Sequence, residues 1–279
     1  MDAVPYLFCD SVAGTMADIR NISKQLKPVD HSRFSIWKAA FGNHADKRST
    51  ISFYIGFYSG IWTYILVEET GDFDFASLKQ LDRKYLQISR VFFDFAQFRP
   101  SNREEIEEIS SYISPFLNVA KLYLGKTDIN ENDLSVFLSY FQSAPFEWIT
   151  ALRYSQCCEE FLKLRLQSDF LKKIDIDEDG WSQELQAEIQ EFVLKKPFRG
   201  VDCSGTTFVF DLSFFEEIFE VKPSENQISF YGNFSFAREQ LEEFKKSLQD
   251  FSADNTKIVW KRKDGARVVA CTWYIELFK

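Results

Sequence analysis

Apolar residues near the start of the chain recur at helical spacing. The apolar face that begins at residue 4 continues to Leu26, and Pro28 ends it. A second helix is predicted over residues 34–44, with Trp37 on its apolar side. The apolar positions of the first helix, four residues apart, are Val4, Phe8, Val12 and Met16. The first 49 residues therefore predict a small helical module.

The pattern then changes to that of a β-hairpin. Residues 50–57 and 61–67 are rich in Ile, Phe and Tyr, and the residues between them, Tyr58-Ser59-Gly60, form a turn sequence. The acidic stretch 68–74 follows the second strand. We expect this stretch to be the boundary between the hairpin and the rest of the chain.

From Leu86 onward, short strands of apolar-x-apolar type alternate with segments that predict amphipathic helices. After a first interval of 36 residues, the strands begin 26 to 30 residues apart. Such a near-constant period predicts a solenoid. Strands joined by helical crossovers must run parallel, with the helices on the outer side of the sheet. The predicted inward pairs are Leu86/Ile88, Leu122/Leu124, Trp148/Thr150, Ile174/Ile176, Val201/Cys203, Ile228/Phe230 and Ile258/Trp260.

The alternate residues of these strands are predicted to face outward as a ladder of side chains. Such a curved, side-chain-rich face is the surface that solenoids use for binding, although an ordinary solvated sheet face has the same pattern. Residues 146–154 also fit a register shifted by one position, which would exchange the two faces. The predicted outward residues are Gln87, Ser89, Lys121, Tyr123, Lys173, Asp175, Asp202, Ser229 and Tyr231.

Helices are predicted between the strands at residues 102–112, 182–195 and 237–248, the first two opened by the polar caps Asn102 and Ser182. At the end of the chain, residues 256–263, the turn 264–265 and residues 266–277 predict an antiparallel hairpin that caps the repeats. The expected parts are a helical module (1–49), the hairpin with its boundary (50–74), and an α/β repeat domain with its hairpin cap (75–279).

Composition and charge narrow the class of protein. Of the 279 residues 45% are hydrophobic and 17% aromatic, which is typical of a folded core, and the net charge is −9. A chain with a net negative charge is expected to bind nucleic acids poorly, because such binding needs a basic surface. The basic spot of residues 261–263 with Arg267 is interpreted as a solvated, edge-protecting face.

Location is predicted from the apolar runs and the cysteines. No apolar run reaches the about 18 to 20 residues that span a bilayer, and the first residues do not resemble a signal peptide. Five scattered cysteines do not form a disulfide framework, so we expect reduced thiols. These features predict a cytoplasmic or nuclear protein without a membrane partner.

Catalytic and cofactor-binding motifs are scarce. The chain has only two histidines, and Cys157-Cys158 lacks the spacing of a zinc or redox site, which leaves one buried and one partly exposed thiol as the expectation. Gly125-Lys126-Thr127 lacks the further glycine of a phosphate loop. We therefore expect no enzyme, no cofactor and no small-molecule substrate.

One loop resembles the first half of a calcium loop. Asp175, Asp177, Asp179 and Gly180 have the right spacing, but the twelfth position is Gln186, where calcium needs a bidentate carboxylate. The alternative is a polar loop that ends a strand before the helix capped by Ser182. We expect that this loop holds no metal ion.

The first segment resembles an F-box. The residues that carry the resemblance are the Val4-Pro5 start, the apolar positions Phe8, Val12 and Met16, the second group Ile19, Ile22 and Leu26, and the closing Trp37. The whole chain is similar to F-box-like proteins expanded in nematodes, which continue into a leucine-rich-repeat-like or F-box-associated region. The resemblance implies an α/β fold in which an F-box-like module and a hairpin precede a short, degenerate leucine-rich-repeat-like solenoid.

The resemblance also implies a function. In that family the first helices dock on a Skp-type adaptor, which bridges to a cullin ubiquitin ligase, so the chain would be a substrate receptor. A ligase-independent binding protein of the same architecture, such as a defence factor or an inhibitor or antidote, stays open as the alternative. The implied adaptor face comprises Val4, Pro5, Phe8, Val12, Met16 and Trp37.

Overall fold

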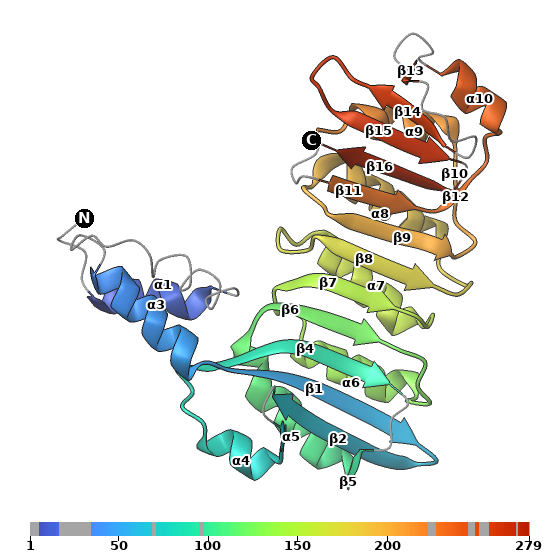
Figure 1. Cartoon of the computed structure of the whole chain (residues 1–279). Helices are drawn as coiled ribbons and strands as arrows, with labels where there is room; N and C mark the ends of the chain where they lie inside the picture. The colour runs from blue at the N-terminus through green and yellow to red at the C-terminus, as the bar shows by residue number, and fades with distance from the viewer. Residues whose placement is uncertain are drawn as a thin grey trace. The chain divides into compact units, whose positions relative to one another are not determined.

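The fold is α/β, as expected, and its sheet is mixed, with antiparallel as well as parallel strand pairs (Figure 1). The computed structural model describes residues 6–16, 35–68, 71–94, 98–222, 227–244, 249–250, 257–271 and 273–278. The chain divides into two compact units. Unit 1 comprises Met1–Lys121 and Ser143–Phe146, and unit 2 comprises Leu122–Gln142 and Glu147–Lys279.

The described part of unit 1 begins with helices α1 (Tyr6–Thr15) and α3 (Ser35–Lys47), which pack against each other, and continues into a sheet. The remaining elements are β1 (Ser49–Tyr58), β2 (Ile61–Glu68), β3 (Gly71–Phe73), α4 (Phe75–Gln80), β4 (Leu86–Asp94), β5 (Arg99–Ser101), α5 (Arg103–Ile113), the 3-10 helix η2 (Ser114–Phe116) and the first part of β6 (Leu117–Leu124).

The predicted hairpin is confirmed and lies inside the sheet of unit 1. Strands β1 and β2 pair antiparallel around Ser59 and Gly60, both of which have positive φ, as tight hairpin turns require. Strand β1 also pairs in parallel with β4, so the strand order is β6-β4-β1-β2-β3, with β5 on β2. The boundary expected between residues 74 and 75 therefore falls within unit 1.

Unit 2 contains the regularly spaced strands. Its elements among the described residues are the second part of β6, α6 (Glu131–Tyr140), β7 (Phe146–Ala151, of which Phe146 belongs to unit 1), α7 (Gln156–Leu166), β8 (Lys173–Asp177), α8 (Gln183–Lys195), β9 (Gly200–Gly205), β10 (Val209–Phe210), α9 (Leu212–Glu220), β11 (Gln227–Tyr231), β12 (Asn233–Phe234), α10 (Arg238–Glu243), β13 (Gln249–Asp250), β14 (Ile258–Lys261), β15 (Arg267–Cys271) and β16 (Tyr274–Phe278). Of the helix predicted over residues 237–248, the last four positions lie outside the described residues.

The predicted parallel pairing is confirmed for four strands of unit 2. Strand β7 pairs with β8, β8 with β9, and β9 with β11, each in parallel. The predicted inward residues of β8, β9 and β11 are buried, and α7 and α8 lie on that face of the strands (Figure 1). The buried residues are Ile174, Ile176, Val201, Cys203, Ile228 and Phe230.

The inward pair predicted for β7, Trp148 and Thr150, is wrong by one position. The buried residues are Ile149 and Ala151, and Ile149 pairs with Ile174 on β8. Because side chains alternate across a strand, Trp148 and Thr150 lie on the opposite, open face. Ile149 is more completely apolar than Trp148, whose indole N–H needs a partner, and this difference decides the register.

The C-terminal segment makes three strands where two were predicted. Strands β14 and β15 pair antiparallel around the expected Asp264-Gly265 turn, but β15 ends at Cys271 and a separate β16 begins at Tyr274. Strand β16 pairs antiparallel with both β11 and β15. The predicted strand with Ile258 and Trp260 is therefore β14, which pairs antiparallel with β15. It does not lie beside β11, because β16 lies between β15 and β11.

Side-chain caps start the helices at regular intervals. Each cap accepts a hydrogen bond from the backbone N–H three residues later, which satisfies one donor of the first turn. The predicted caps Asn102 and Ser182 are confirmed. The five caps of α5 to α9 are Asn102, Asn130, Ser155, Ser182 and Asp211. In the described part of the chain, no helix has the length and apolar character needed to cross a membrane.

Candidate protein-binding surfaces

Helix α1 opens with three large apolar residues that face solvent. Tyr6, Leu7 and Phe8 are 38%, 77% and 55% exposed. The ring of Phe8 stands edge-on to Trp37 of α3, with 6.1 Å between the ring centroids. We call Tyr6, Leu7 and Phe8 the apolar patch. Consecutive exposed side chains of this size often mark a contact with another molecule.

The residues of the implied adaptor face fall into three groups. Val4 and Pro5 lie outside the described residues. Phe8 belongs to the apolar patch. The remaining three are half-buried: Val12, Met16 and Trp37.

Met16 and Trp37 pack inward against a small core formed by Ala13 of α1 and Phe41 of α3. The Trp37 and Phe41 rings are 5.7 Å apart. These two side chains therefore hold the helix pair together and expose only part of their surface. The sequence pattern did not single out Tyr6 and Leu7, because neither lies on the four-residue apolar spacing.

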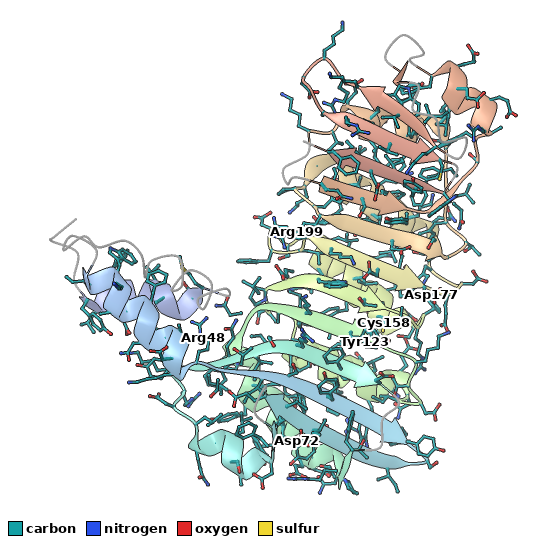
Figure 2. The ribbon with its side chains drawn as sticks, in the orientation of Figure 1. Arg48, Asp72, Tyr123, Cys158, Asp177 and Arg199 are labelled. Carbon is teal, nitrogen blue, oxygen red and sulfur yellow. The ribbon has the colours of Figure 1, made fainter. Side chains whose placement is uncertain are left out.

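Arg48 joins the helix pair to the sheet of unit 1 (Figure 2). Its buried guanidinium donates hydrogen bonds to the carbonyls of Ala13, Gly14 and Met16 at the end of α1, and to Oε1 of Gln87 on β4 at 3.1 Å. These carbonyls are the acceptors that a helix end leaves without a partner. Gln87 was predicted to face solvent, but it is buried because it binds Arg48.

A second polar cluster holds α1 against α3. Oδ1 of Asp10 lies 3.1 Å from Nε2 of His44, and Oδ2 lies 2.7 Å from Nζ of Lys84. Burial raises the pKa of Asp10, but the contacts with Lys84 and His44 outweigh it and hold this pKa below its usual value. Burial lowers the pKa of His44, and together with the nearby charges of Arg48 and Lys84 it outweighs the opposite effect of Asp10. His44 is therefore a buried structural residue, and its Nδ1 has no hydrogen-bond partner.

The open face of unit 2 carries the outward residues predicted on its strands. In the pairing of neighbouring strands, Asp175 lies beside Asp202, and Asp202 beside Tyr231. Gly200 lies between Lys173 and Ser229, where a Cβ atom would come within 3.3 Å of the Ser229 hydroxyl. The predicted residues on this face are half-buried: Tyr123, Lys173, Asp175, Asp202, Ser229 and Tyr231. Lys121, also half-buried, belongs to unit 1.

Trp148 organises one part of this face. Its indole N–H donates to Oδ2 of Asp175 at 2.7 Å, and Nζ of Lys173 lies 3.9 Å from the centre of its ring. Nζ of Lys173 is also 3.4 Å from the same Asp175 oxygen. The Lys173 ammonium group is thus held between the face of the Trp148 ring and the Asp175 carboxylate, both of which attract a cation. The one-residue error in the register of β7 hid Trp148 from the sequence prediction.

Aromatic residues gather where β11 meets β16. The Tyr231 ring centroid is 6.2 Å from that of Trp273 and 5.8 Å from that of Tyr274. Trp273 is 55% exposed. Glu276 accepts hydrogen bonds from Nε2 of Gln227 at 3.2 Å and from the Tyr231 hydroxyl at 3.4 Å. We call Asp202, Tyr231, Trp273, Tyr274 and Glu276 the acidic-aromatic corner.

The loop that resembles half a calcium site uses its carboxylates internally. Asp175 binds Trp148 and Lys173, and Oδ1 of Asp177 accepts the backbone N–H of Glu178 at 2.9 Å. Within the described ranges, no group of three or more His, Cys, Asp or Glu side chains could hold a metal ion. The loop fits the alternative of a polar turn before the Ser182 cap.

All five cysteines lie among the described residues and carry free thiols, as expected. Cys157 and Cys158 are both buried, so the expectation that one is partly exposed is wrong. A hydrogen bond with the Cys158 thiol lowers the pKa of Cys157 to about 7, and the same contact raises the pKa of Cys158. The backbone N–H of Cys157 donates to Glu131 of α6, which places this pair in the packing between two helices.

The basic spot near the C-terminus also differs from its interpretation. Lys261, Lys263 and Arg267 are exposed, but Arg262 is buried. Nη1 of Arg262 donates to the carbonyls that end α9, those of Phe219 at 2.7 Å and Val221 at 2.6 Å. Only three of the four charges therefore face solvent.

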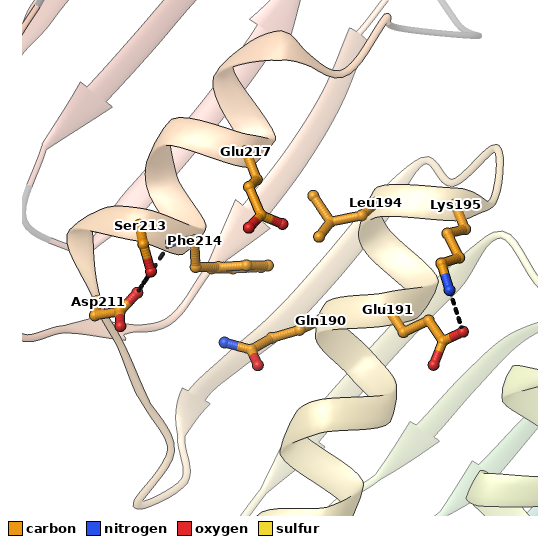
Figure 3. Close-up of a pocket in the computed structure, with 8 residues that line it drawn as sticks. All are labelled: Gln190, Glu191, Leu194, Lys195, Asp211, Ser213, Phe214 and Glu217. Carbon is orange, nitrogen blue, oxygen red and sulfur yellow. Dashed lines mark hydrogen bonds and ion pairs between the residues drawn. The ribbon is translucent and has the colours of Figure 1, made fainter.

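A cleft of about 360 Å³ lies between α8 and α9 of unit 2 (Figure 3). Four of its lining side chains are paired with one another, Lys195 with Glu191 at 2.6 Å, and Asp211 with the Ser213 hydroxyl at 2.7 Å, while Gln190 and Glu217 also line it. Asp211 also caps α9. The cleft therefore offers few polar groups that could orient a small molecule.

Among the residues that the structure describes, the apolar patch and the open face of unit 2 are thus the two candidate binding surfaces. Comparison with protein-family models, curated proteins and solved structures gave no match, so the residues of these two surfaces carry the functional argument.

Proposed function

We propose that this chain is a non-enzymatic protein-binding module and the substrate receptor of a cullin-type ubiquitin ligase. In this proposal α1 and α3 form an F-box-like module that docks on a Skp-type adaptor. The strands of unit 2 form a degenerate leucine-rich-repeat-like solenoid, and its open face receives the protein to be modified. The proposal includes no nucleic acid, membrane or small-molecule substrate.

The observation that carries the proposal is the apolar patch. Leu7 and Phe8 expose more than half of their surface, although each would gain from burial by about 1.5–3 kcal/mol. A partner that covers the patch supplies this burial. An F-box-like helix that docks on an adaptor places its apolar side chains in such a contact.

Co-purification of the full chain with a Skp-type adaptor tests the proposal. Phe8→Asp places a charge in the contact and should abolish co-purification, with a melting temperature close to that of the wild type, because Phe8 is exposed. Ala39→Asp is the matched control, since Ala39 is an exposed residue of α3 outside the apolar patch, and it should bind normally. Failure of the wild type to bind the adaptor would refute the ligase assignment.

A ligase-independent binding protein is the second candidate function. The half-buried residues of the implied adaptor face favour it. Met16 and Trp37 pack against Ala13 and Phe41, so they stabilise the helix pair whether or not an adaptor binds. Under this candidate the wild type binds no adaptor, while the open face of unit 2 still binds a protein.

A further inference from the structure

The open face of unit 2 holds one of its own cations in a defined arrangement. Lys173 lies over the Trp148 ring at 3.9 Å and beside Asp175 at 3.4 Å. The ring face carries negative charge density, and the carboxylate adds a full charge, so both attract the ammonium group. This pair of contacts is an internal example of cation recognition on this sheet.

The acidic-aromatic corner combines the same two elements. Side chains of paired residues lie on the same face of a sheet, and the strand pairing sets Asp202 beside Tyr231, and Tyr231 beside Tyr274. Glu276 stands beside Ser229 on this face, and Trp273 precedes Tyr274 with 4.5 Å between their ring centroids. Three aromatic rings are therefore flanked by two carboxylates.

The carboxylates of the corner are bound to neutral groups. Oδ1 of Asp202 accepts from the backbone N–H and the hydroxyl of Ser204, at 3.0 and 2.7 Å. Glu276 accepts from Gln227 and Tyr231. Among the described residues, neither the Asp202 nor the Glu276 carboxylate forms an ion pair, whereas Asp175 pairs with Lys173. The negative charge of the corner is therefore left uncompensated by these contacts.

The electrostatics of Tyr231 agree with this geometry. Burial and the nearby charges of Glu276 and Asp202 raise the pKa of its hydroxyl. Arg238 and Lys257 lie close enough to Cys271 to favour its thiolate, against the effect of burial, but they are not among the groups that shift the pKa of Tyr231. A cation brought to the corner would meet a negative potential and the exposed ring of Trp273.

We propose that the acidic-aromatic corner binds an arginine or lysine side chain in a basic segment of a protein partner. Charge complementarity selects a cation, and the open strand surface suits an extended chain more than an enclosed ligand. Arginine fits best, because its planar guanidinium can stack on a ring while it donates to a carboxylate. This inference rests on the proposed function in one respect, that the open face of unit 2 receives a protein.

The test follows the indole N–H signals of the full ¹⁵N-labelled chain by NMR. The probe is the peptide acetyl-Gly-Arg-Gly-Arg-Gly-amide, and its control replaces both arginines with glutamine. The chain has six tryptophans, and the spectrum of Trp273→Phe assigns the signal of interest. We expect the arginine peptide to shift the Trp273 signal and leave that of the buried Trp260 unchanged. The glutamine peptide should shift neither.

Two isosteric variants locate the contact. Glu276→Gln and Asp202→Asn should each lower the affinity for the arginine peptide by about threefold, as expected for a partly exposed charge contact. Glu216→Gln, an exposed residue of α9, makes the same change in net charge and should leave the affinity unchanged. Equal shifts from both peptides, or equal affinities in Glu276→Gln and the wild type, would overturn the proposal.

Two further arms separate this proposal from its alternatives. Choline at the same concentration should shift the Trp273 signal less than the peptide, and an equal or larger shift would indicate a small-cation site in place of a protein contact. Phe8→Asp should keep the response to the arginine peptide. A chain that binds no adaptor but responds to the peptide contradicts only the ligase assignment, whereas adaptor binding without a peptide response contradicts only this inference.

Discussion

The end of helix α1 in unit 1 and the starts of the helices in unit 2 are held by differently arranged hydrogen bonds. In unit 1 the guanidinium of Arg48 binds carbonyls at the end of α1 and ties them to β4 through Gln87, and the Asn118 amide donates to the carbonyl of Thr15. In unit 2 each of the helices α6 to α9 starts with its own side-chain cap. Arg48 therefore concentrates several bonds at the end of α1 in one side chain, whereas unit 2 repeats a separate cap at the start of each helix.

Contacts between successive helices repeat in unit 2 as well. Glu131 of α6 accepts the backbone N–H of Cys157 at the start of α7, at 2.8 Å. Glu159 of α7 accepts the backbone N–H and the hydroxyl of Ser182 before α8. A carboxylate at a helix start is favoured by the helix dipole, so each contact stabilises the neighbouring helix. The comparison predicts local failure in unit 1 and graded losses in unit 2.

The largest effect is expected from Arg48→Ala. The change removes the guanidinium donor shared by the carbonyls of Ala13, Gly14 and Met16 and by the buried Gln87, and the loss of these bonds together should cost about 3–5 kcal/mol. Hydrogen exchange should show loss of protection in residues 6–16, with unit 2 unchanged. Arg90→Ala, an exposed position on β4, is the control and should leave both regions protected. Retained protection of α1 in Arg48→Ala would remove the distinction between the two regions.

A smaller effect is expected from Glu159→Gln in unit 2. Glu159 is buried and binds Ser182 and Lys163, so loss of its charge should cost about 1–2 kcal/mol. Urea unfolding should detect this loss, and hydrogen exchange should place it at the start of α8. Glu160→Gln, the neighbouring and exposed residue, serves as control. Equal stabilities of the two variants would contradict the role of the carboxylate.

The smallest effect is expected from pH, and it should be confined to the helix pair. The pKa of His44 is lower in the folded chain than the about 6.5 of an unfolded histidine. The unfolded state therefore binds more protons near that pH, so stability is complete above it and falls as the pH decreases below it. The lowered pKa of Asp10 adds a further loss in strong acid, where the unfolded carboxyl becomes protonated first.

Protection factors of residues 6–16, measured between pH 7.5 and 5.5, check this dependence. They should decrease with pH in the wild type and change much less in His44→Gln, which cannot titrate. The exchange of α7 and α8 in unit 2 provides the internal reference. A decrease of the same size in His44→Gln would show that another group is responsible.

Local patterns in the sequence determined much of the α/β arrangement in both units. The apolar-x-apolar strands at 26 or 27 residues, and the caps Asn102 and Ser182, are short-range features, and they correctly predicted parallel strands and helix starts. The hairpin of β1 and β2 was likewise visible in its turn residues. Each of these features depends on residues only a few positions apart, so one sequence is enough to reveal them.

Tertiary structure alone decided the helix ends and the composition of the binding surfaces. Arg48 binds carbonyls that lie 32 to 35 residues earlier in the chain, at the end of α1, and Arg262 binds carbonyls 41 to 43 residues earlier, at the end of α9. Nothing local in the sequence distinguishes these two residues from solvated arginines. The acidic-aromatic corner forms because β16 inserts between β11 and β15 and brings Trp273 and Glu276 beside Tyr231. Such contacts depend on which strands become neighbours, and that choice follows from burial summed over the whole unit.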